Sequence, residues 1–449
     1  MIGLAIYLGV VAVLLAGSIR RPAFALGAFL CMFGLEQWGT AKIGFVASHG
    51  TFTNYLALAL VLMAFGIRLF KRGGLRLING PTHVLVILLY MYAAATLLWT
   101  PAYHVAMEEW KAQAPYLLFA IILLPLLIQN ADDAMEGLLG TVIAGAILAA
   151  ALAFLVDWGY RRIVSEVAGG ANIRLPWPIP HLGAILSVIA VLFFRWRGAA
   201  ALVALGLVAI SLILVVKTGS RGQLISMVLS AMLFLPISRG WSLSRGSLAG
   251  LAAAALAMVA IWWFLPDLSN LASTQEARFD TERAVEDYEG RVAAALRLLD
   301  IYLSSGVLGL LFGLGSSASF APEIRGFYTH IVPVEVLCEL GAVGFLLFVG
   351  ALGFTVRALV RLASIMSSPQ ISPEMRRAVA CLSALALIEL LLSLKQGSLV
   401  RDVNLFLFPI LIEGLLASAA AQTLKGTTAR SMGRSAIRGA QQQDLAVGS

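Results

Sequence analysis

Apolar stretches long enough to cross a lipid bilayer recur along almost the whole chain. They are rich in Leu, Ala and Val and do not alternate as a half-buried strand does, and 60% of all residues are hydrophobic while 12% are charged. Backbone polar groups inside hydrocarbon have to be satisfied within a helix or a closed barrel, and long stretches without alternation favour helices. The sequence therefore predicts an all-α, polytopic membrane protein.

Length and apolarity predict about 12–13 transmembrane helices, of which the second is short and could be re-entrant. This pattern divides the chain into an N-terminal transmembrane part (1–265), one long connection (266–330), a C-terminal transmembrane part (331–424) and a polar tail (425–449) that we expect to be disordered. The predicted spans lie near 2–17, 22–35, 51–70, 82–100, 113–128, 136–157, 179–194, 199–216, 221–237, 246–265, 332–355, 378–395 and 403–421.

The basic residues predict the orientation of these spans. One alternate set of connections holds more than half of the 32 Lys and Arg residues and few acids, so the positive-inside rule makes that set cytoplasmic. The polar tail belongs to this set, which places the C-terminus in the cytoplasm and the long connection outside. The net charge of +8 is dispersed among connections, and nucleic-acid binding is not expected. The cytoplasmic set comprises Arg20, Arg21, Arg68, Lys71, Arg72, Arg76, Arg195, Arg197, Arg239, Arg245, Arg357, Arg361, Arg376, Arg377, Lys425, Arg430, Arg434 and Arg438.

The stretch "KTGSRG" lies on the predicted outer face, between two spans. It carries Lys217, and it places Arg221 at the head of the span near 221–237. Ser220 or Thr218 could cap that helix with a side-chain hydrogen bond. The N–H groups of the first turn and the guanidinium would then face the same way, which predicts an anion site at the membrane–water boundary.

The long connection contains a predicted amphipathic helix that starts near Asp280 or Thr281, either of which could cap it. Such a helix can lie on the bilayer and roof a cavity. Arg291 falls at its apolar edge, where it could point at a headgroup or, alternatively, pair with Asp287 in solvent. The next segment, "GVLGLLFGLGSSASF", fits neither nucleotide-binding motif, so its glycines predict tight turns and close backbone approach. The apolar positions of the helix are Val285, Tyr288, Val292, Leu296, Leu299 and Leu303.

His330 stands at the mouth of the span near 332–355, with Glu335 and Glu339 four residues apart on one face of that span. Ionisable groups inside a membrane segment are candidates for a functional site, although both carboxylates could instead pair with basic residues for structure. Structural pairing is the preferred interpretation for Glu389 and Glu413. The histidine could act as a base near neutral pH, or it could merely cap its helix.

Three local patterns resemble the membrane O-antigen ligase and polymerase superfamily, whose members transfer glycans from undecaprenyl diphosphate. "TGSRGQLI" is similar to the family's outer-face arginine that opens a span, and "EGRVAAALRLLDIYLSSGVLGLLFGLGSS" is similar to its loop segment. "HIVPVEVLCELGAVG" is similar to its histidine followed by Gly-x-x-Gly, here Gly341 and Gly344. The residue after the histidine is Ile331, where the ligases usually have Asn, Ser or Gln.

The resemblance implies a GT-C-like fold and an inverting glycosyltransferase in the bacterial inner membrane, with its active site on the periplasmic face. The donor would be an undecaprenyl-diphosphate-linked glycan, and the acceptor a sugar hydroxyl of a second glycan or of the lipid-A core. Arg221 and Arg291 would hold the diphosphate and His330 would be the catalytic base. Further substrate-binding candidates are Arg174, Lys217, Glu335 and Glu339.

No cofactor is expected, and the transfer is predicted to be metal-independent, because the adjacent acidic pair Asp132–Asp133 lies on the predicted cytoplasmic side. Two other classes of function stay open at this point. The chain could be a multi-pass transporter or flippase of a lipid-linked glycan or an anion. It could also be a membrane scaffold without chemistry, in which case replacing the two arginines and the histidine would leave cellular polysaccharide unchanged.

Overall fold

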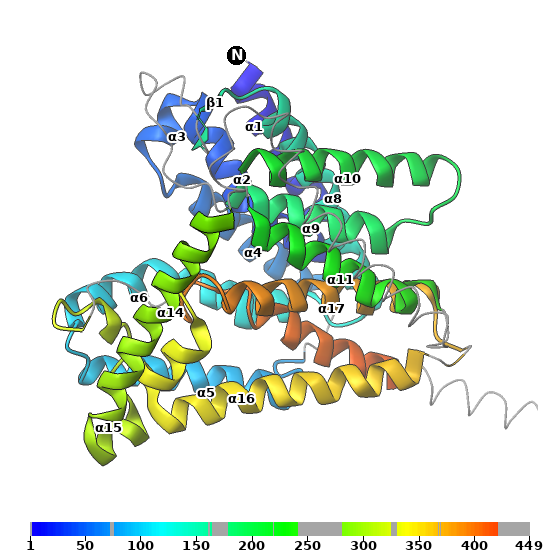
Figure 1. Ribbon diagram of the computed structural model, residues 1–449. Coiled ribbons are helices and arrows are strands. Elements are labelled where there is room, and N and C mark those ends of the chain that lie inside the picture. Colours follow the sequence, from blue (N-terminus) through cyan, green and yellow to red (C-terminus); the bar gives the residue numbers. More distant parts are fainter. Residues whose placement is uncertain are drawn as a thin grey trace, which may run out of the picture.

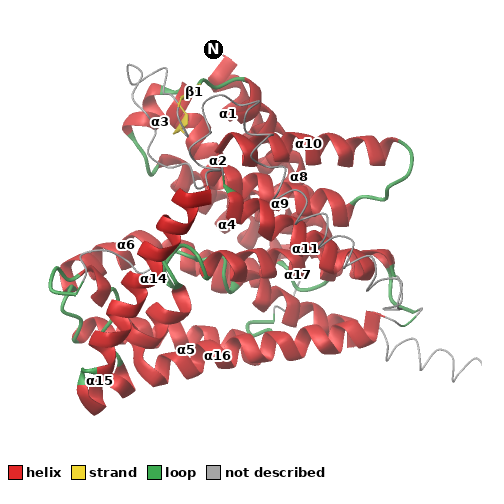
Figure 2. Ribbon diagram, in the orientation of Figure 1, coloured by secondary structure: helices red, strands yellow, loops and turns green. Residues whose placement is uncertain are grey.

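The computed structural model describes residues 2–71, 76–159, 162–163, 178–218, 220–240, 281–324, 330–366, 368 and 370–420. Within these ranges the chain is helical apart from its connections and one two-residue ribbon, in which β1 (Trp158–Gly159) pairs antiparallel with β2 (Arg162–Ile163) (Figure 2). The helices are α1 (Ile2–Arg20), α2 (Ala25–Lys42), α3 (Gly44–Ser48), α4 (Phe52–Lys71), α5 (Pro81–Ala95), α6 (Tyr103–Leu118), α7 (Leu124–Leu127), α8 (Ala131–Phe154), α9 (Pro178–Phe193), α10 (Ala199–Thr218), α11 (Arg221–Arg239), α14 (Thr281–Leu303), α15 (Gly306–Phe312), α16 (Val332–Met366) and α17 (Pro373–Ser393).

Eight helical segments among the described residues are long and apolar enough to cross a membrane. The prediction of a polytopic helical protein is therefore confirmed at this level, whereas the predicted count of spans is larger. Four other predicted spans correspond to α2, α17, α9 and a helix at Leu407–Ala420, which are more polar or shorter. The predicted span near 246–265 lies outside the described residues. The eight segments are Ile2–Arg20, Phe52–Lys71, Pro81–Leu98, Tyr103–Leu127, Ala131–Phe154, Ala199–Thr218, Arg221–Arg239 and Val332–Met366.

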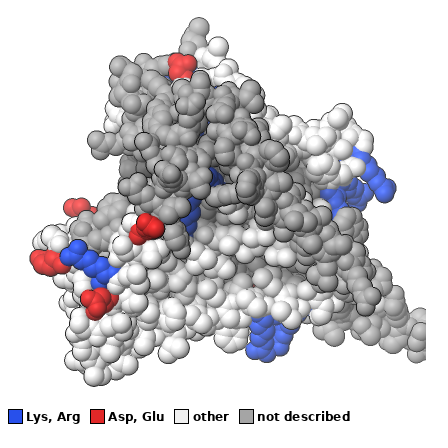
Figure 3. Space-filling view, in the orientation of Figure 1, with Lys and Arg blue, Asp and Glu red and all other residues white. Residues whose placement is uncertain are grey.

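Helices α9, α11 and α17 pack together, and arginines tie them at one end. Arg239, the last residue of α11, donates hydrogen bonds to the carbonyl oxygens of Phe194 (3.1 Å) and Val191 (3.0 Å). Arg377, in the first turns of α17, donates to the carbonyl oxygen of Phe193 at 3.2 Å. Figure 3 shows basic side chains without acidic neighbours beside α10, whereas acidic and basic side chains mingle near α14 and α15. Part of the predicted cytoplasmic set therefore lies at one end of these helices.

Helix α14 occupies the predicted amphipathic segment and crosses the ends of α5 and α16 (Figure 1). Its side chains up to residue 288 lie outside the described set, and the proposed pairing of Arg291 with Asp287 lies there too. Ala295, Leu298 and Tyr302 are buried within the protein, whereas Leu296 and Leu303, two of the predicted apolar positions, are exposed. Tyr302 also donates a hydrogen bond to the carbonyl oxygen of Leu310 at 2.7 Å, which folds α15 back onto α14.

The glycine-rich segment after α15 lies against a break in α16. At Gly341 the backbone leaves the helical region (φ 65°, ψ −168°), and the freed carbonyl oxygens of Cys338 and Glu339 accept hydrogen bonds from Leu314 N–H (3.0 Å) and Gly315 N–H (2.8 Å). A methyl group on Gly341 would lie 2.4 Å from the nitrogen of Gly313. The predicted close backbone approach is therefore found, and its partner is α16.

Candidate functional site

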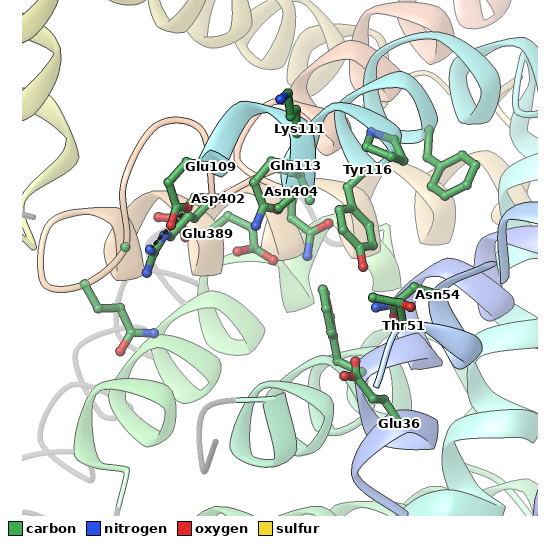
Figure 4. Close-up of a pocket in the computed structure, with 18 of the residues that line it drawn as sticks. Glu36, Thr51, Asn54, Glu109, Lys111, Gln113, Tyr116, Glu389, Asp402 and Asn404 are labelled. Carbon is green, nitrogen blue, oxygen red and sulfur yellow. Dashed lines mark hydrogen bonds and ion pairs between the residues drawn. The ribbon is translucent and has the colours of Figure 1, made fainter. Parts of the chain in front are cut away.

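A cavity of about 690 Å³ lies between α2, α6, α14, α17 and the segment 394–406 that follows α17 (Figure 4). This volume falls within the roughly 300–1,000 Å³ typical of small-molecule sites. Charged groups of both signs, amides and aromatic rings line it. The ionisable lining residues are Glu36, Glu109, Lys111, Arg291, His330, Glu389, Arg401 and Asp402, and the amides are Gln37, Asn54, Gln113, Gln396 and Asn404.

Arg291 and His330, 39 positions apart in the sequence, line this same cavity. Arg291 comes from α14, and its Nη1 donates a hydrogen bond to the carbonyl oxygen of Lys395 at 2.9 Å. His330 precedes α16 and has a left-handed backbone (φ 67°). For a residue other than glycine this conformation costs about 1–3 kcal/mol and persists only where the surroundings impose it. The imidazole is therefore attached to a backbone that the fold holds in one place.

Arg221 is the first residue of α11, as predicted, and it is not among the lining residues of the cavity. The next residue, Gly222, faces the end of α17 so closely that a methyl group there would lie 2.7 Å from Nζ of Lys395. Because Arg291 binds the carbonyl oxygen of the same Lys395, the head of α11 and the cavity-lining Arg291 share one neighbour.

The predicted side-chain cap of α11 is wrong. Ser220 is at the N-cap position but makes no side-chain capping hydrogen bond, and its carbonyl oxygen accepts from Leu224 N–H at 3.2 Å. The hydroxyl of Thr218 donates instead to the carbonyl oxygen of Val215, at the end of the preceding helix, at 2.9 Å.

The two glutamates of α16 bind backbone N–H groups and do not line the cavity. Glu335 and Glu339 are each 4% exposed, and neither lines the cavity. Glu335 accepts a hydrogen bond from Leu399 N–H at 2.9 Å. Glu339 accepts from Ser317 N–H at 2.6 Å and Ser319 N–H at 3.0 Å. Each carboxyl group holds the backbone of a connection, so substrate binding by either stays a prediction.

Of the two remaining predicted substrate ligands, the one that the structure describes is Lys217, and it is not brought to the cavity. Lys217 donates to the carbonyl oxygen of Ala153 at 2.7 Å, its ammonium lies 5.6 Å from the ring centroid of Trp158, and it does not line the cavity. Arg174 lies outside the described residues.

An ion pair that was not predicted joins α6 to the segment 394–406. Both carboxylate oxygens of Glu109 accept from Arg401, with an Nε–Oε2 distance of 2.8 Å. The guanidinium also lies 5.6 Å from the ring centroid of Phe320. Next to it, burial and the nearby Glu389 carboxylate raise the pKa of Asp402 well above its ordinary value. Nothing in the sequence pattern marked Glu109, Arg401 or Asp402 as residues of a site.

The other intramembrane glutamates have partners of the structural kind that was expected. Glu389 lies 3.1 Å from Nε2 of His181, and both side chains are buried, although Glu389 also reaches the cavity. Glu413 accepts from the backbone N–H groups of Thr82 (3.1 Å) and His83 (3.4 Å), at the start of α5. A carboxylate is favourable there because the first N–H groups of a helix have no partner within the helix.

The adjacent acids predicted to lie on the cytoplasmic side are far from a metal-site arrangement. Asp133 is buried in an ion pair with Arg68, at 2.9 Å, and it also accepts from Gln129 N–H at 3.2 Å. Among the residues that the structure describes, no group of three or more His, Cys, Asp or Glu is arranged to hold a metal ion.

No family model matches this chain, and no curated protein is similar to it at a significant level. The function therefore has to be inferred from the site and from the three motifs. In chemical terms the cavity offers an imidazole, basic groups, carboxyl groups on two opposite sides, amides and aromatic rings.

Proposed function

We propose that this protein is an integral-membrane inverting glycosyltransferase, which moves a glycan from undecaprenyl diphosphate to a sugar hydroxyl of an acceptor. The observation that carries the proposal is that Arg291 and His330 line one cavity, and that Gly222, which follows Arg221 at the head of α11, faces Lys395, whose carbonyl oxygen binds Arg291. Arg221, Arg291 and His330 come from three separate motifs, and each motif resembles the O-antigen ligase and polymerase superfamily.

In the proposed reaction the acceptor hydroxyl oxygen attacks the anomeric carbon, and the bond from that carbon to the phosphate oxygen breaks. The electron pair of the broken bond stays with the leaving diphosphate, and the hydroxyl proton passes to His330. Direct attack inverts the anomeric centre. Arg291 and Arg221 would stabilise the charge that grows on the leaving group, because a guanidinium stays protonated and offers several donors to phosphate oxygens.

The proposed setting is a bacterial inner membrane, with the cavity on the periplasmic side and the C-terminus in the cytoplasm. The arginines that tie α9, α11 and α17 support this orientation, because they lie at the end of α11 opposite to Arg221. The acceptor is a second lipid-linked glycan in a polymerase and a lipid-A-core sugar in a ligase, and the same donor site would serve both.

The test is glycan transfer by purified full-length protein, from a lipid-diphosphate glycan to defined acceptors, with and without EDTA. We expect transfer to persist in EDTA, Arg291→Lys to slow it by roughly 10²–10³-fold, and His330→Asn by roughly 10²–10⁴-fold. Asparagine suits the histidine position because it tolerates the left-handed backbone but cannot accept a proton at neutral pH.

Matched controls are Arg297→Lys, an exposed arginine on the same helix, and His104→Asn, an exposed histidine on α6. Both should transfer at the wild-type rate. Wild-type rates in Arg291→Lys and His330→Asn would refute the proposal. Flux of a labelled lipid-linked glycan across proteoliposomes without transfer would favour a transporter instead.

A further inference from the structure

One part of the cavity has a chemistry that the proposed transfer step does not use. Glu36 from α2, Asn54 from the first turn of α4 and Tyr116 from α6 lie together, across the cavity from Glu109 and Asp402 (Figure 4). Rings from the same elements, including Phe33 and Tyr55, line the cavity as well. We call Glu36, Asn54, Tyr116 and Asn404 the amide–carboxyl subsite.

This subsite contains hydrogen-bond acceptors that the protein leaves unused. Oδ1 of Asn54 and Oδ1 of Asn404 are buried and accept no hydrogen bond within the described structure, and Asn404 is only 9% exposed. Stranding a buried polar atom costs about 1–3 kcal/mol, and native proteins seldom leave one without a reason. Both atoms belong to side chains that line the cavity, so a ligand there would lie against these two amide groups.

Glu36 adds a carboxyl group to these amides. Its side chain faces the cavity, and no hydrogen bond or ion pair joins it to another described residue. A ligand with several hydroxyl groups would satisfy this carboxyl group and bond with the amide groups beside it, while the aromatic rings would cover the apolar face of a sugar ring.

We infer that the amide–carboxyl subsite binds a pyranose ring through its hydroxyl groups, in the same cavity that would hold the diphosphate. This inference rests on the proposed function for the ring's role, which is that of a sugar of the donor glycan or of the acceptor. A sugar of the donor and a sugar of the acceptor offer the same hydroxyl groups. They can be told apart because altering the subsite should raise the KM only for the substrate whose sugar binds there.

The test is direct binding of sugars to the full-length protein in detergent, measured by calorimetry. The probes are the methyl glycosides of glucose, galactose, mannose, rhamnose and N-acetylglucosamine. At least one should bind the wild type, and Glu36→Gln and Asn54→Ala should each weaken its Kd at least tenfold. Asn404→Leu, which is similar in size and removes the amide oxygen, is a further variant in case truncation at the subsite unfolds the protein, and it should also weaken binding. The matched control is Glu108→Gln, an exposed glutamate on α6, which should bind as the wild type does.

Binding of none of the five glycosides would overturn the inference, as would wild-type affinity in folded Glu36→Gln and Asn54→Ala. His330→Asn and Arg291→Lys should keep sugar binding while losing transfer. A wild type that binds sugar but transfers nothing would sink the proposed function and leave the subsite standing. Transfer by Glu36→Gln with an unchanged KM for both substrates would instead sink the subsite and leave the proposed function standing. A raised KM for the acceptor alone assigns the subsite to the acceptor, and a raised KM for the donor alone assigns it to the donor.

Discussion

Replacing Glu339 with leucine should destabilise the protein through the connection that follows α15. The carboxyl group accepts hydrogen bonds from Ser317 N–H at 2.6 Å and Ser319 N–H at 3.0 Å, and all three residues are buried. Leucine accepts neither bond. A buried donor left without an acceptor costs about 1–3 kcal/mol, so two such donors should cost about 2–6 kcal/mol. Glu339→Gln keeps one acceptor oxygen and should lose less.

The assay is thermal unfolding of the full-length protein in detergent, followed by tryptophan fluorescence and by the fraction that stays monodisperse. The matched control is Glu323→Leu, because that glutamate is exposed and lies in the same connection between α15 and α16. Its replacement should change the free energy of unfolding by at most about 0.5 kcal/mol. We expect the melting temperature to fall in the order Glu323→Leu, Glu339→Gln, Glu339→Leu. A Glu339→Leu variant that melts with the wild type would refute the reasoning.

Three further predictions concern the stability of the fold around the cavity and within α16. Gly341→Val should unfold the protein more easily than Gly353→Ala, measured by melting temperature, because a Cβ at Gly341 would meet backbone at 2.4 Å on a left-handed residue, whereas Gly353 faces open space. A double-mutant cycle with Arg401→Ala and Glu109→Ala should give a coupling below about 1 kcal/mol that weakens in high salt, because the pair is partly exposed. The pKa of Asp402 is raised in the folded state, so the folded protein holds the carboxyl proton more tightly than the unfolded chain does. The stabilisation from this group should be complete below the ordinary pKa of an aspartate and should be lost as pH rises through the raised pKa. Asp402→Asn should therefore make the melting temperature depend less on pH between these two pKa values.

The helical architecture was predictable because its signal is local. Length and apolarity mark the spans, and α11 begins at Arg221 as predicted. Periodicity marked an apolar stripe on α14 but could not say which residues of the helix meet the protein: the structure buries Tyr302 and exposes Leu303. The glycines after α15 predicted close approach, but they could not name α16 as the partner.

The candidate site was predictable only in part, for a related reason. Motif resemblance singled out Arg291 and His330 and gave no reason to consider Glu36 or Asn404, because their place in the cavity depends on how α2 and the segment after α17 pack. The Arg401–Glu109 pair joins residues 292 positions apart, and such a pairing leaves no trace in a single sequence.

The intramembrane carboxyl groups connect the fold to the site. Glu335 binds the backbone of Leu399, within the same connection that carries Arg401, Asp402 and Asn404 into the cavity. It does so from the first turn of α16, five residues after the strained His330. The hydroxyl group of Tyr90 donates a hydrogen bond to the carbonyl oxygen of the same Leu399 at 3.0 Å. The histidine and the segment after α17 are therefore positioned by one helix start, so a change at Glu335 should move both together and alter transfer without any contact to substrate.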